Sequence, residues 1–508
     1  MEIRKYEMLE ISLGHAELEK ATEENAAVFQ FCGTPEEEKK QIKVPAFRCS
    51  GGEYRVRFMP MHEGLWKYRI LAGTQNSGGE FLCTAPAENM HGPVRTKGEG
   101  FVYDDGVRFL PFGTTCYAWI HQPEELRGET LHTLENAPFN KIRMCIFPKS
   151  MPYNNNDPEV YPFRKKEDGS WNVNDPDPVF WDMLDAQIIN LKKLGIEADL
   201  ILFHPYDRWG FAQVTQEESC TYLRYCIARL SAHSNIWWSL ANEYEMVHAK
   251  TLEDWDEYGE ILLAEDPYRH LISIHNFLQL YPKKRWMTHC SVQSGDINRI
   301  LLWKEQYGLP VMIDECGYEG DIEYEWGNLT GFEMVHRFWQ TMCRGGFCTH
   351  GETFHREDEV LWWAKGGKLY GESAPRIAFL RELLESLPGE WKPIRRRIGN
   401  PNADLSDPAE AESEKKFKEM MEKFPQDIQD SFYAQTPLQI ESDQFRLLYL
   451  GHACPSRIHM QLPDDGSWKI ELIDVWNMTR NFLIEGVRGN ICLGLPAKEG
   501  MALLAVKE

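Results

Sequence analysis

The stretch from Asn235 to Tyr244 (NIWWSLANEY) constrains the fold of this chain more than any other. It opens with a continuous run of strand-favouring apolar residues and closes on the polar pair Asn242-Glu243. An apolar run without alternation is typical of a strand buried on both faces, as in a parallel sheet. In a parallel α/β barrel the C-terminal strand ends face the active-site mouth, so we expect Glu243 there. The alternative is that Glu243 only caps the following helix, since acids are favoured in first turns.

A second short apolar run, Pro310-Val311-Met312-Ile313, also ends in acids, Asp314 and Glu315. Cys316-Gly317 follows, and the glycine allows the backbone to turn. The barrel rule would place Glu243 and Glu315 on the same rim. Two carboxylates in one cleft can take different roles, one protonated as an acid and one ionised as a nucleophile, and glycoside cleavage needs that division.

Residues 96–394 alternate such strands with helical patterns, which predicts βα units and a (β/α)8 TIM barrel. Helical periodicity is clearest from Phe180 to Leu191, and Gly195 is expected to end that helix. A closed barrel needs eight strands. The sequence offers eight candidates: 109–113, 140–147, 197–203, 236–240, 271–275, 287–291, 310–315 and 346–350.

Different patterns flank the barrel. Residues 1–95 contain short alternating strands separated by turn signals, which predicts a β-sandwich of immunoglobulin or fibronectin type. Residues 395–435 begin with Arg395-Arg396-Arg397 and are rich in Glu and Lys, typical of a linker or a solvated surface helix. Strand patterns return in 436–508, which predicts a small C-terminal β-domain.

Four stretches at predicted strand ends carry a family resemblance: FLPFGTTCYAWIHQ, HPYDRWGF, NIWWSLANEYE and MIDECGYEG. Together they make residues 98 to about 390 resemble the clan A retaining glycoside hydrolases, and more narrowly the apiosidase-like or collagen-binding group of bacterial (β/α)8-barrel glycosidases. The resemblance implies that Glu243 on strand four is the general acid/base and Glu315 on strand seven the nucleophile. It further implies that Asn242 binds the sugar 2-hydroxyl and that Arg143 lies near the nucleophile. Some relatives have an Asp-Thr pair where this chain has Thr114-Thr115.

Other polar and aromatic residues follow predicted strands and are candidates for binding the sugar. Four histidines are either neutral hydrogen-bonding groups or a metal site; because the first strand region lacks histidine, we expect no metal and no cofactor. The long loop 148–178 is expected to form a cleft wall carrying Tyr153 and Trp171. The candidates are His204, His275, His289, His350, Trp119, His121, Tyr206, Asp207, Trp209, Trp362, Trp363, Glu319 and Glu352.

Charge and cysteine content exclude some classes of protein. The net charge of −23 argues against nucleic-acid binding, which needs a basic surface. The 13 cysteines show no CxxC pairs, and the N-terminus lacks a signal-peptide core, so we expect reduced thiols in the cytoplasm and no membrane association. Oligomeric state leaves no mark in the sequence. Two alternatives to a retaining glycosidase remain: a metal-dependent barrel hydrolase and a non-catalytic carbohydrate-binding protein.

Overall fold

A computed structural model describes residues 1–15, 25–33, 41–71, 77–395, 407–434 and 438–508 of the chain. These residues form two compact units. The first comprises residues 1–293 and 355–369, and the second comprises residues 294–354 and 370–508. Arg396 and Arg397 of the predicted linker lie outside the described residues.

One eight-stranded parallel sheet carries the predicted barrel, with the order β18-β17-β16-β13-β12-β22-β20-β19. A parallel bridge between His275 and Ser291 joins the chain after β18 to β19, the two strands at the ends of that order. The TIM-barrel prediction is therefore confirmed. The strands are β12 (Phe112–Thr115), β13 (Lys141–Cys145), β16 (Glu197–Phe203), β17 (Ile236–Ala241), β18 (Ile272–Ser273), β19 (Cys290–Gln293), β20 (Val311–Glu315) and β22 (Phe347–His350).

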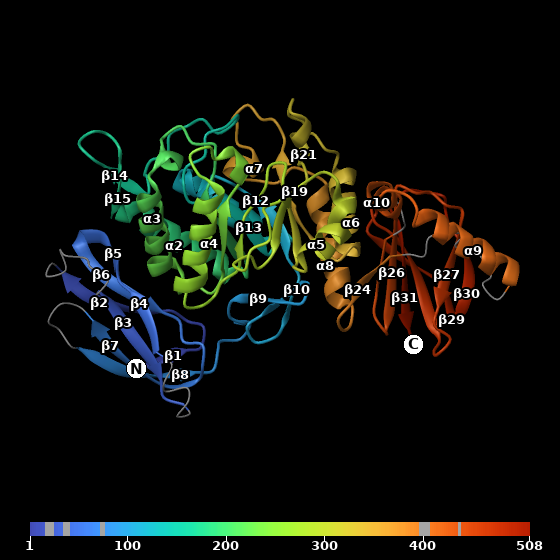
Figure 1. The fold of residues 1–508 in the computed structure, drawn as a ribbon, viewed down its shortest axis with the longest axis horizontal. Helices are drawn as coiled ribbons and strands as arrows, with labels where there is room; N and C mark the ends of the chain where they lie inside the picture. Colours follow the sequence, from blue (N-terminus) through green and yellow to red (C-terminus); the bar gives the residue numbers. More distant parts are fainter. Residues whose placement is uncertain (16–24, 34–40, 72–76, 396–406, 435–437) are drawn as a thin grey trace. The chain divides into compact units, whose positions relative to one another are not determined.

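Helices follow the strands, as the βα pattern predicts (Figure 1). The side chain of Asp177 caps α2, which begins at Pro178, and Gly195 follows this helix with a φ of 71°. Thr215 and Glu218 form a reciprocal capping box on α3. The helices are α1 (Glu124–Glu135), α2 (Pro178–Lys193), α3 (Gln216–Leu230), α4 (Leu252–Glu265), α5 (Ile300–Tyr307), α6 (Gly331–Cys343), α7 (Trp362–Lys365) and α8 (Ser373–Ser386).

The first barrel strand lies further along the chain than the sequence pattern indicates. Residues 108–109 form β11 (Arg108–Phe109), which pairs with β10 (Gly100–Tyr103), itself paired with β9 (Val94–Lys97). The rings of Phe101 and Phe109 pack on Trp237, near the N-terminal end of β17. Apolar residues before β12 therefore close the bottom of the barrel.

The N-terminal region is the predicted β-sandwich. A five-stranded sheet has the order β1-β8-β7-β3-β4, and a three-stranded sheet has the order β2-β6-β5. Phe29 of one sheet stacks on Phe58 of the other with ring centroids 3.9 Å apart. The strands are β1 (Glu2–Arg4), β2 (Leu9–His15), β3 (Ala26–Phe31), β4 (Gln41–Pro45), β5 (Phe47–Arg48), β6 (Glu53–Phe58), β7 (Gly64–Leu71) and β8 (Gly78–Thr84).

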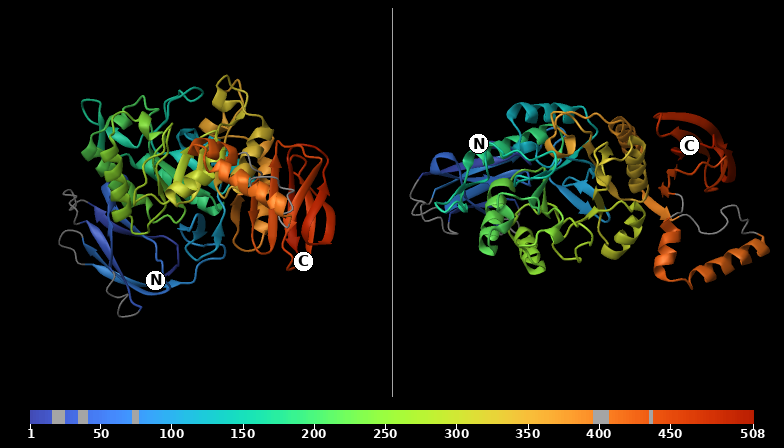
Figure 2. Two further views of the ribbon diagram at one scale, coloured as in Figure 1. Left: turned by 45° about the vertical axis from the view of Figure 1, so that its right-hand side comes forward. Right: turned by 90° about the horizontal axis from the view of Figure 1, so that it is seen from above.

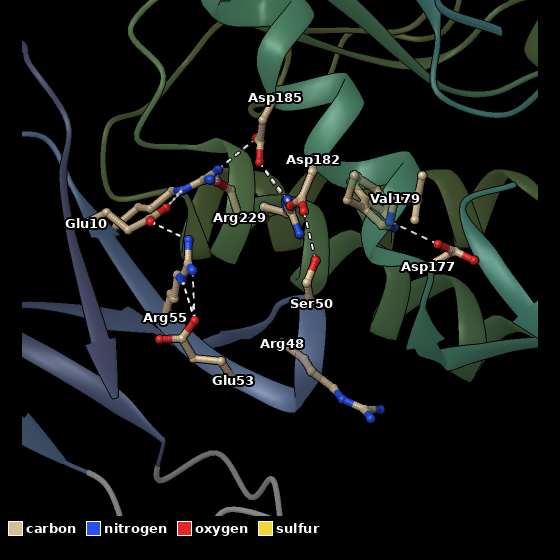
Figure 3. Close-up of polar contacts among 12 residues, drawn as sticks. Glu10, Arg48, Ser50, Glu53, Arg55, Asp177, Val179, Asp182, Asp185 and Arg229 are labelled. Carbon is tan, nitrogen blue, oxygen red and sulfur yellow. Dashed lines mark hydrogen bonds and ion pairs between the residues drawn. The ribbon is translucent and has the colours of Figure 1, made fainter. Parts of the chain in front are cut away.

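A buried ionic network joins this sandwich to α2 and α3 within the first unit (Figure 3). The carboxylate of Asp185 on α2 accepts hydrogen bonds from Arg57 of the sandwich at 2.7 Å and from Nε of Arg229 at 2.9 Å. His233 Nε2 lies 3.1 Å from the same carboxylate. Burial disfavours ionisation, but His233 and the two guanidinium groups outweigh it, so the pKa of Asp185 lies well below its usual value.

The loop 148–178 contains a hairpin that the sequence did not suggest. Strands β14 (Phe163–Lys165) and β15 (Trp171–Pro176) pair antiparallel. Trp171 is buried, and its ring stacks on Phe211 with centroids 4.4 Å apart. Trp171 therefore packs the interior of the loop and is not a cleft-wall side chain, because its ring face is already covered.

The second unit ends in the predicted C-terminal β-domain (Figure 2). Its main sheet has the order β24-β25-β26-β31-β28-β29, and β27 pairs with β30. Two helices, α9 (Pro408–Met421) and α10 (Gln426–Ala434), lie between β24 and β25 in the chain. The strands are β24 (Lys392–Arg395), β25 (Leu438–Glu441), β26 (Phe445–Gly451), β27 (Arg457–Leu462), β28 (Trp468–Asp474), β29 (Thr479–Val487), β30 (Gly489–Gly494) and β31 (Met501–Lys507).

All 13 cysteines are free thiols, and ten of them are buried. Within the described part of the chain, no helix combines the length and the apolar character needed to cross a bilayer.

Candidate active site

Glu243 lies directly after the fully buried strand β17 and is itself buried. Its backbone is left-handed, with φ of 51°, which is costly for a residue with a side chain and is concentrated at functional sites. The helical turn Tyr244–Met246 begins there, yet the Glu243 side chain forms no capping hydrogen bond. The interpretation of Glu243 as a helix cap is therefore wrong.

The carboxylate of Glu243 instead accepts a hydrogen bond from the hydroxyl of Tyr206, with an O–O distance of 2.5 Å. Burial, and then the charge of Glu243, raises the pKa of Tyr206 well above its usual value, so the phenol remains a donor. The backbone N–H of Glu243 donates to Nδ1 of His275 at 3.4 Å. Two predicted site residues, Tyr206 and His275, thus fix the position of Glu243.

Asn242 is the centre of a second set of hydrogen bonds. Its side-chain oxygen accepts from the hydroxyl of Tyr117 and from Arg143, both at 3.1 Å. Arg143 also donates to the hydroxyl of Ser291 at 3.0 Å. Among the described residues, the buried amide nitrogen of Asn242 has no hydrogen-bond partner. This arrangement leaves Asn242 with a donor available for a ligand hydroxyl.

Lys149 was missed by the sequence analysis. Its side chain is only 2% exposed, and its ammonium lies 3.3 Å from the ring centre of Tyr117 and 4.4 Å from that of Tyr206. Burial lowers the pKa of Lys149 to about 8, although the nearby carboxylate of Glu243 opposes this shift. No carboxylate of the described chain lies within 4.0 Å of this ammonium, so two tyrosine rings hold the cation. The sequence feature that could have identified Lys149 is its position just beyond the end of β13.

Several other candidates lie in the packed interior around these residues. Trp119 donates to the sulfur of Met144, and Trp362 donates to the hydroxyl of Thr114 at 2.8 Å. The ring of His121 stacks on Phe180. Burial lowers the pKa values of His121 to about 4 and of His204 to about 3, so both imidazoles are neutral at pH 7. These side chains therefore contribute packing and hydrogen bonds around the residues of the site.

Three of the predicted residues lie in different places from those expected. His289 precedes β19, and its ring packs on Trp237 and Phe101 at the N-terminal end of the strands. Asp207 accepts backbone hydrogen bonds from Trp209, Gly210 and Ala212, so its carboxylate braces a turn. The indole of Trp209 donates to Asp157 at the surface.

In the second unit, Glu315 is the last residue of β20 and is partly exposed. The dense packing around its carboxyl raises the pKa of Glu315 to about 8, and a hydrogen bond from Tyr318 opposes this rise. The preceding acid, Asp314, is buried and accepts from the hydroxyl of Thr349 at 2.9 Å. Of the two acids that end this strand, Glu315 is therefore the one available to a ligand.

Glu319, His350 and Glu352 lie together beyond β20 and β22, with ligand atoms within 4.8 Å of one another. Glu319 accepts from the backbone N–H groups of Glu372 and Ser373 and so caps α8. Burial raises the pKa of Glu352 to about 7. A second group with metal-ligand spacing is Glu333, His336 and His452. Of the four predicted histidines, His350 belongs to one of these groups, whereas His204, His275 and His289 belong to neither, so the four do not form one metal site among the described residues.

Comparisons with known proteins agree with this architecture. Residues 95–390 match the family model described as apiosidase-like, catalytic domain. Residues 2–73 and 435–505 match two domain families of unknown function, DUF5060 and DUF5605. No curated protein matches the chain.

Solved structures also resemble the chain along most of its length. A crystal structure described as an inferred glycoside hydrolase from Bacteroides vulgatus is 29% identical, with a TM-score of 0.84 and full coverage of both chains. A family 5 glycoside hydrolase from the same organism is 13% identical, with a TM-score of 0.59, covering 82% of this chain and 94% of its own. Another glycoside hydrolase is 12% identical with the same TM-score, covering 82% and 97%.

Proposed function

The chain belongs to the apiosidase-like family of catalytic domains and is a glycoside hydrolase, and from that premise we propose that it works by a retaining double displacement. Glu243 is the general acid/base and Glu315 the nucleophile. Glu315 ends β20 and Glu243 follows the end of β17, two strands of one parallel sheet, and barrel enzymes act from such strand ends. A retaining pair requires carboxyl groups about 5–5.5 Å apart.

The state of Glu243 is the observation that carries this proposal. Its carboxylate is buried, is not used to cap the next helix, and is held by the hydroxyl of Tyr206 in a strained backbone conformation. A purely structural glutamate would gain nothing from that strain. A general acid must instead be held in one orientation toward the leaving-group oxygen.

The proposed reaction has two steps. The Glu315 carboxylate attacks the anomeric carbon while Glu243 gives its proton to the departing oxygen, and a glycosyl ester forms on Glu315. Glu243 then takes a proton from water, whose oxygen attacks the anomeric carbon and releases Glu315. The free amide nitrogen of Asn242 supports a hydrogen bond to the sugar 2-hydroxyl.

The nucleophile must be ionised, although packing raises the pKa of Glu315 to about 8. The proposal therefore needs a nearby cation that lowers this pKa. We assign that role to Arg143, a fully buried guanidinium oriented by Ser291 and Asn242. We propose a small oligosaccharide or glycoside as the substrate. Thirteen free thiols favour a reducing compartment for the protein.

The test combines product stereochemistry with two variants. The wild-type chain is assayed against a panel of aryl β-glycosides and arabinofuranosides, and NMR records the first product anomer. We expect retention of configuration and at least a 1000-fold loss of kcat in Glu315→Ala. Glu243→Ala should lose less activity with aryl glycosides, because a good leaving group needs little protonation. Glu217→Ala, on the exposed side of α3, is the control. An inverted first product, or full activity in either active-site variant, contradicts the proposal.

A further inference from the structure

A pair of exposed aromatic rings lies on the segment between β21 (Glu319–Gly320, labelled in Figure 1) and α6. Tyr324 is 37% exposed and Trp326 is 36% exposed. Their rings are nearly parallel, at 9°, with centroids 5.6 Å apart. Large side chains of this kind usually bury their area in a core, so two exposed parallel rings need an explanation.

The backbone holds this pair rigidly. The carbonyl of Trp326 accepts from the N–H of Tyr318 at 2.7 Å, and the carbonyl of Tyr324 accepts from Gly327. The hydroxyl of Thr353 donates to the carbonyl of Gly327 at 2.7 Å. A Cβ at position 327 would lie 2.5 Å from the side chain of Ile322, so a larger residue here would displace that buried side chain. The rings are therefore preorganised, which reduces the entropy cost of binding a ligand.

The pair is connected to the proposed nucleophile through Tyr318. The ring of Tyr318 meets the ring of Trp326 edge-to-face, with centroids 5.9 Å apart and an angle of 90°. Tyr318 also interacts with the carboxyl of Glu315 and lowers its pKa. Three aromatic side chains thus lead from the end of β20 to the surface of the same unit.

The charge around the rings narrows the class of ligand. Asp321, Glu323 and Glu325 flank the pair and are exposed. Acidic groups repel anionic sugars and accept hydrogen bonds from the hydroxyls of neutral ones. The flat, apolar faces of the rings suit the C–H face of a pyranose.

We infer that Trp326 and Tyr324 form a stacking platform for a neutral sugar unit removed from the bond that is cleaved. The inference rests on the proposed function of Glu315. It makes the substrate an oligosaccharide of several units, since Tyr318 lies between Glu315 and the platform. The alternative occupant of such rings is a protein partner, and the experiment below distinguishes the two.

The test measures binding without hydrolysis, in the full-length Glu243→Gln protein. Calorimetry is run with hexasaccharides and disaccharides of cellulose, β-mannan, xylan and arabinan. Adding Trp326→Ala and Tyr324→Ala should lower the affinity for the hexasaccharide that binds best by about five- to thirtyfold. This is the loss expected for about 1–2 kcal/mol of stacking. Disaccharide binding should stay within about twofold. Phe482→Ala, an exposed ring on β29, is the matched control and should change neither.

Equal hexasaccharide binding with and without the rings overturns the inference, as does the absence of any oligosaccharide binding. Loss of disaccharide binding in parallel would also overturn it, because the rings would then belong to the cleavage subsite. Failure of this inference would appear as an unchanged binding affinity. Failure of the proposed mechanism would instead appear as retained activity in Glu315→Ala, so the two outcomes can be told apart.

Discussion

Asp185→Asn removes the only anion that joins Arg57 of the sandwich to Arg229 of α3 within the described network. Both guanidinium groups remain buried, and breaking a buried pair by removing one partner typically costs about 3–5 kcal/mol. Arg57 keeps its ion pair with Glu10 at 2.7 Å, and Arg229 keeps Asp182. We therefore expect a loss near the lower end, about 3 kcal/mol.

For a unit of about 300 residues, such a loss lowers the melting temperature by about 5 °C. Calorimetry of the full-length chain at pH 7 measures the shift. Asp182→Asn is the matched control, because Asp182 pairs with the same arginine from the same helix but is 54% exposed. Exposed pairs contribute about 0–1 kcal/mol, so the control should melt within about 1–2 °C of wild type.

The pH dependence follows from the lowered pKa of Asp185. A carboxyl with a depressed folded-state pKa stabilises the fold above its unfolded pKa of about 3.9, and this contribution disappears as pH falls toward the folded value. The gap between wild type and Asp185→Asn should stay constant from pH 5 to 8 and shrink below about pH 4. Equal stability of Asp185→Asn and Asp182→Asn at pH 7 would refute the reasoning.

Three further predictions concern single side chains. Tyr206→Phe removes the hydroxyl that holds Glu243 and should lower kcat about 10- to 100-fold with a small change in KM; an unchanged kcat would contradict this role. Lys149→Met removes the buried cation and should lower kcat/KM about tenfold, whereas Lys166→Met on the exposed hairpin should not. Glu197→Gln keeps an acceptor for the indole of Trp237. Burial raises the pKa of Glu197 to about 8, so the carboxyl lowers the stability of the folded protein as pH rises above about 4.5. The variant should therefore be more stable than wild type by up to about 3 kcal/mol at pH 7. If Glu197→Gln melted at a lower temperature than wild type at pH 7 and 8, the buried Glu197 carboxyl would not be a destabilising group.

Continuous apolar patterning explains why the barrel could be predicted. Strands β16, β17 and β20 are buried over nearly their whole length, so their sequences are strongly constrained and easy to read. The first strand was misplaced because Phe109 and Leu110 are as apolar as the strand that follows them, whereas residues 108–109 pair antiparallel with β10. Burial on its own does not reveal which sheet a short apolar run joins.

The site was predicted less completely, because its chemistry depends on contacts between distant segments. Lys149 resembles a surface lysine until the rings of Tyr117 and Tyr206 are seen around its ammonium. His289 resembles a strand-end ligand, but the strand begins after it, so its ring points to the barrel floor. Trp119 was a plausible sugar platform, and its indole is instead buried against Met144.

Azide rescue of Glu315→Ala measures whether Glu315 is the nucleophile. Without the nucleophile, azide can attack the anomeric carbon of an activated aryl glycoside from the vacated side, while Glu243 remains in place. We expect recovered turnover in azide with a glycosyl azide of inverted configuration. Recovered turnover with a glycosyl azide of retained configuration, or rescue with an inverted azide product only in a variant of a carboxylate other than Glu315, would contradict this assignment.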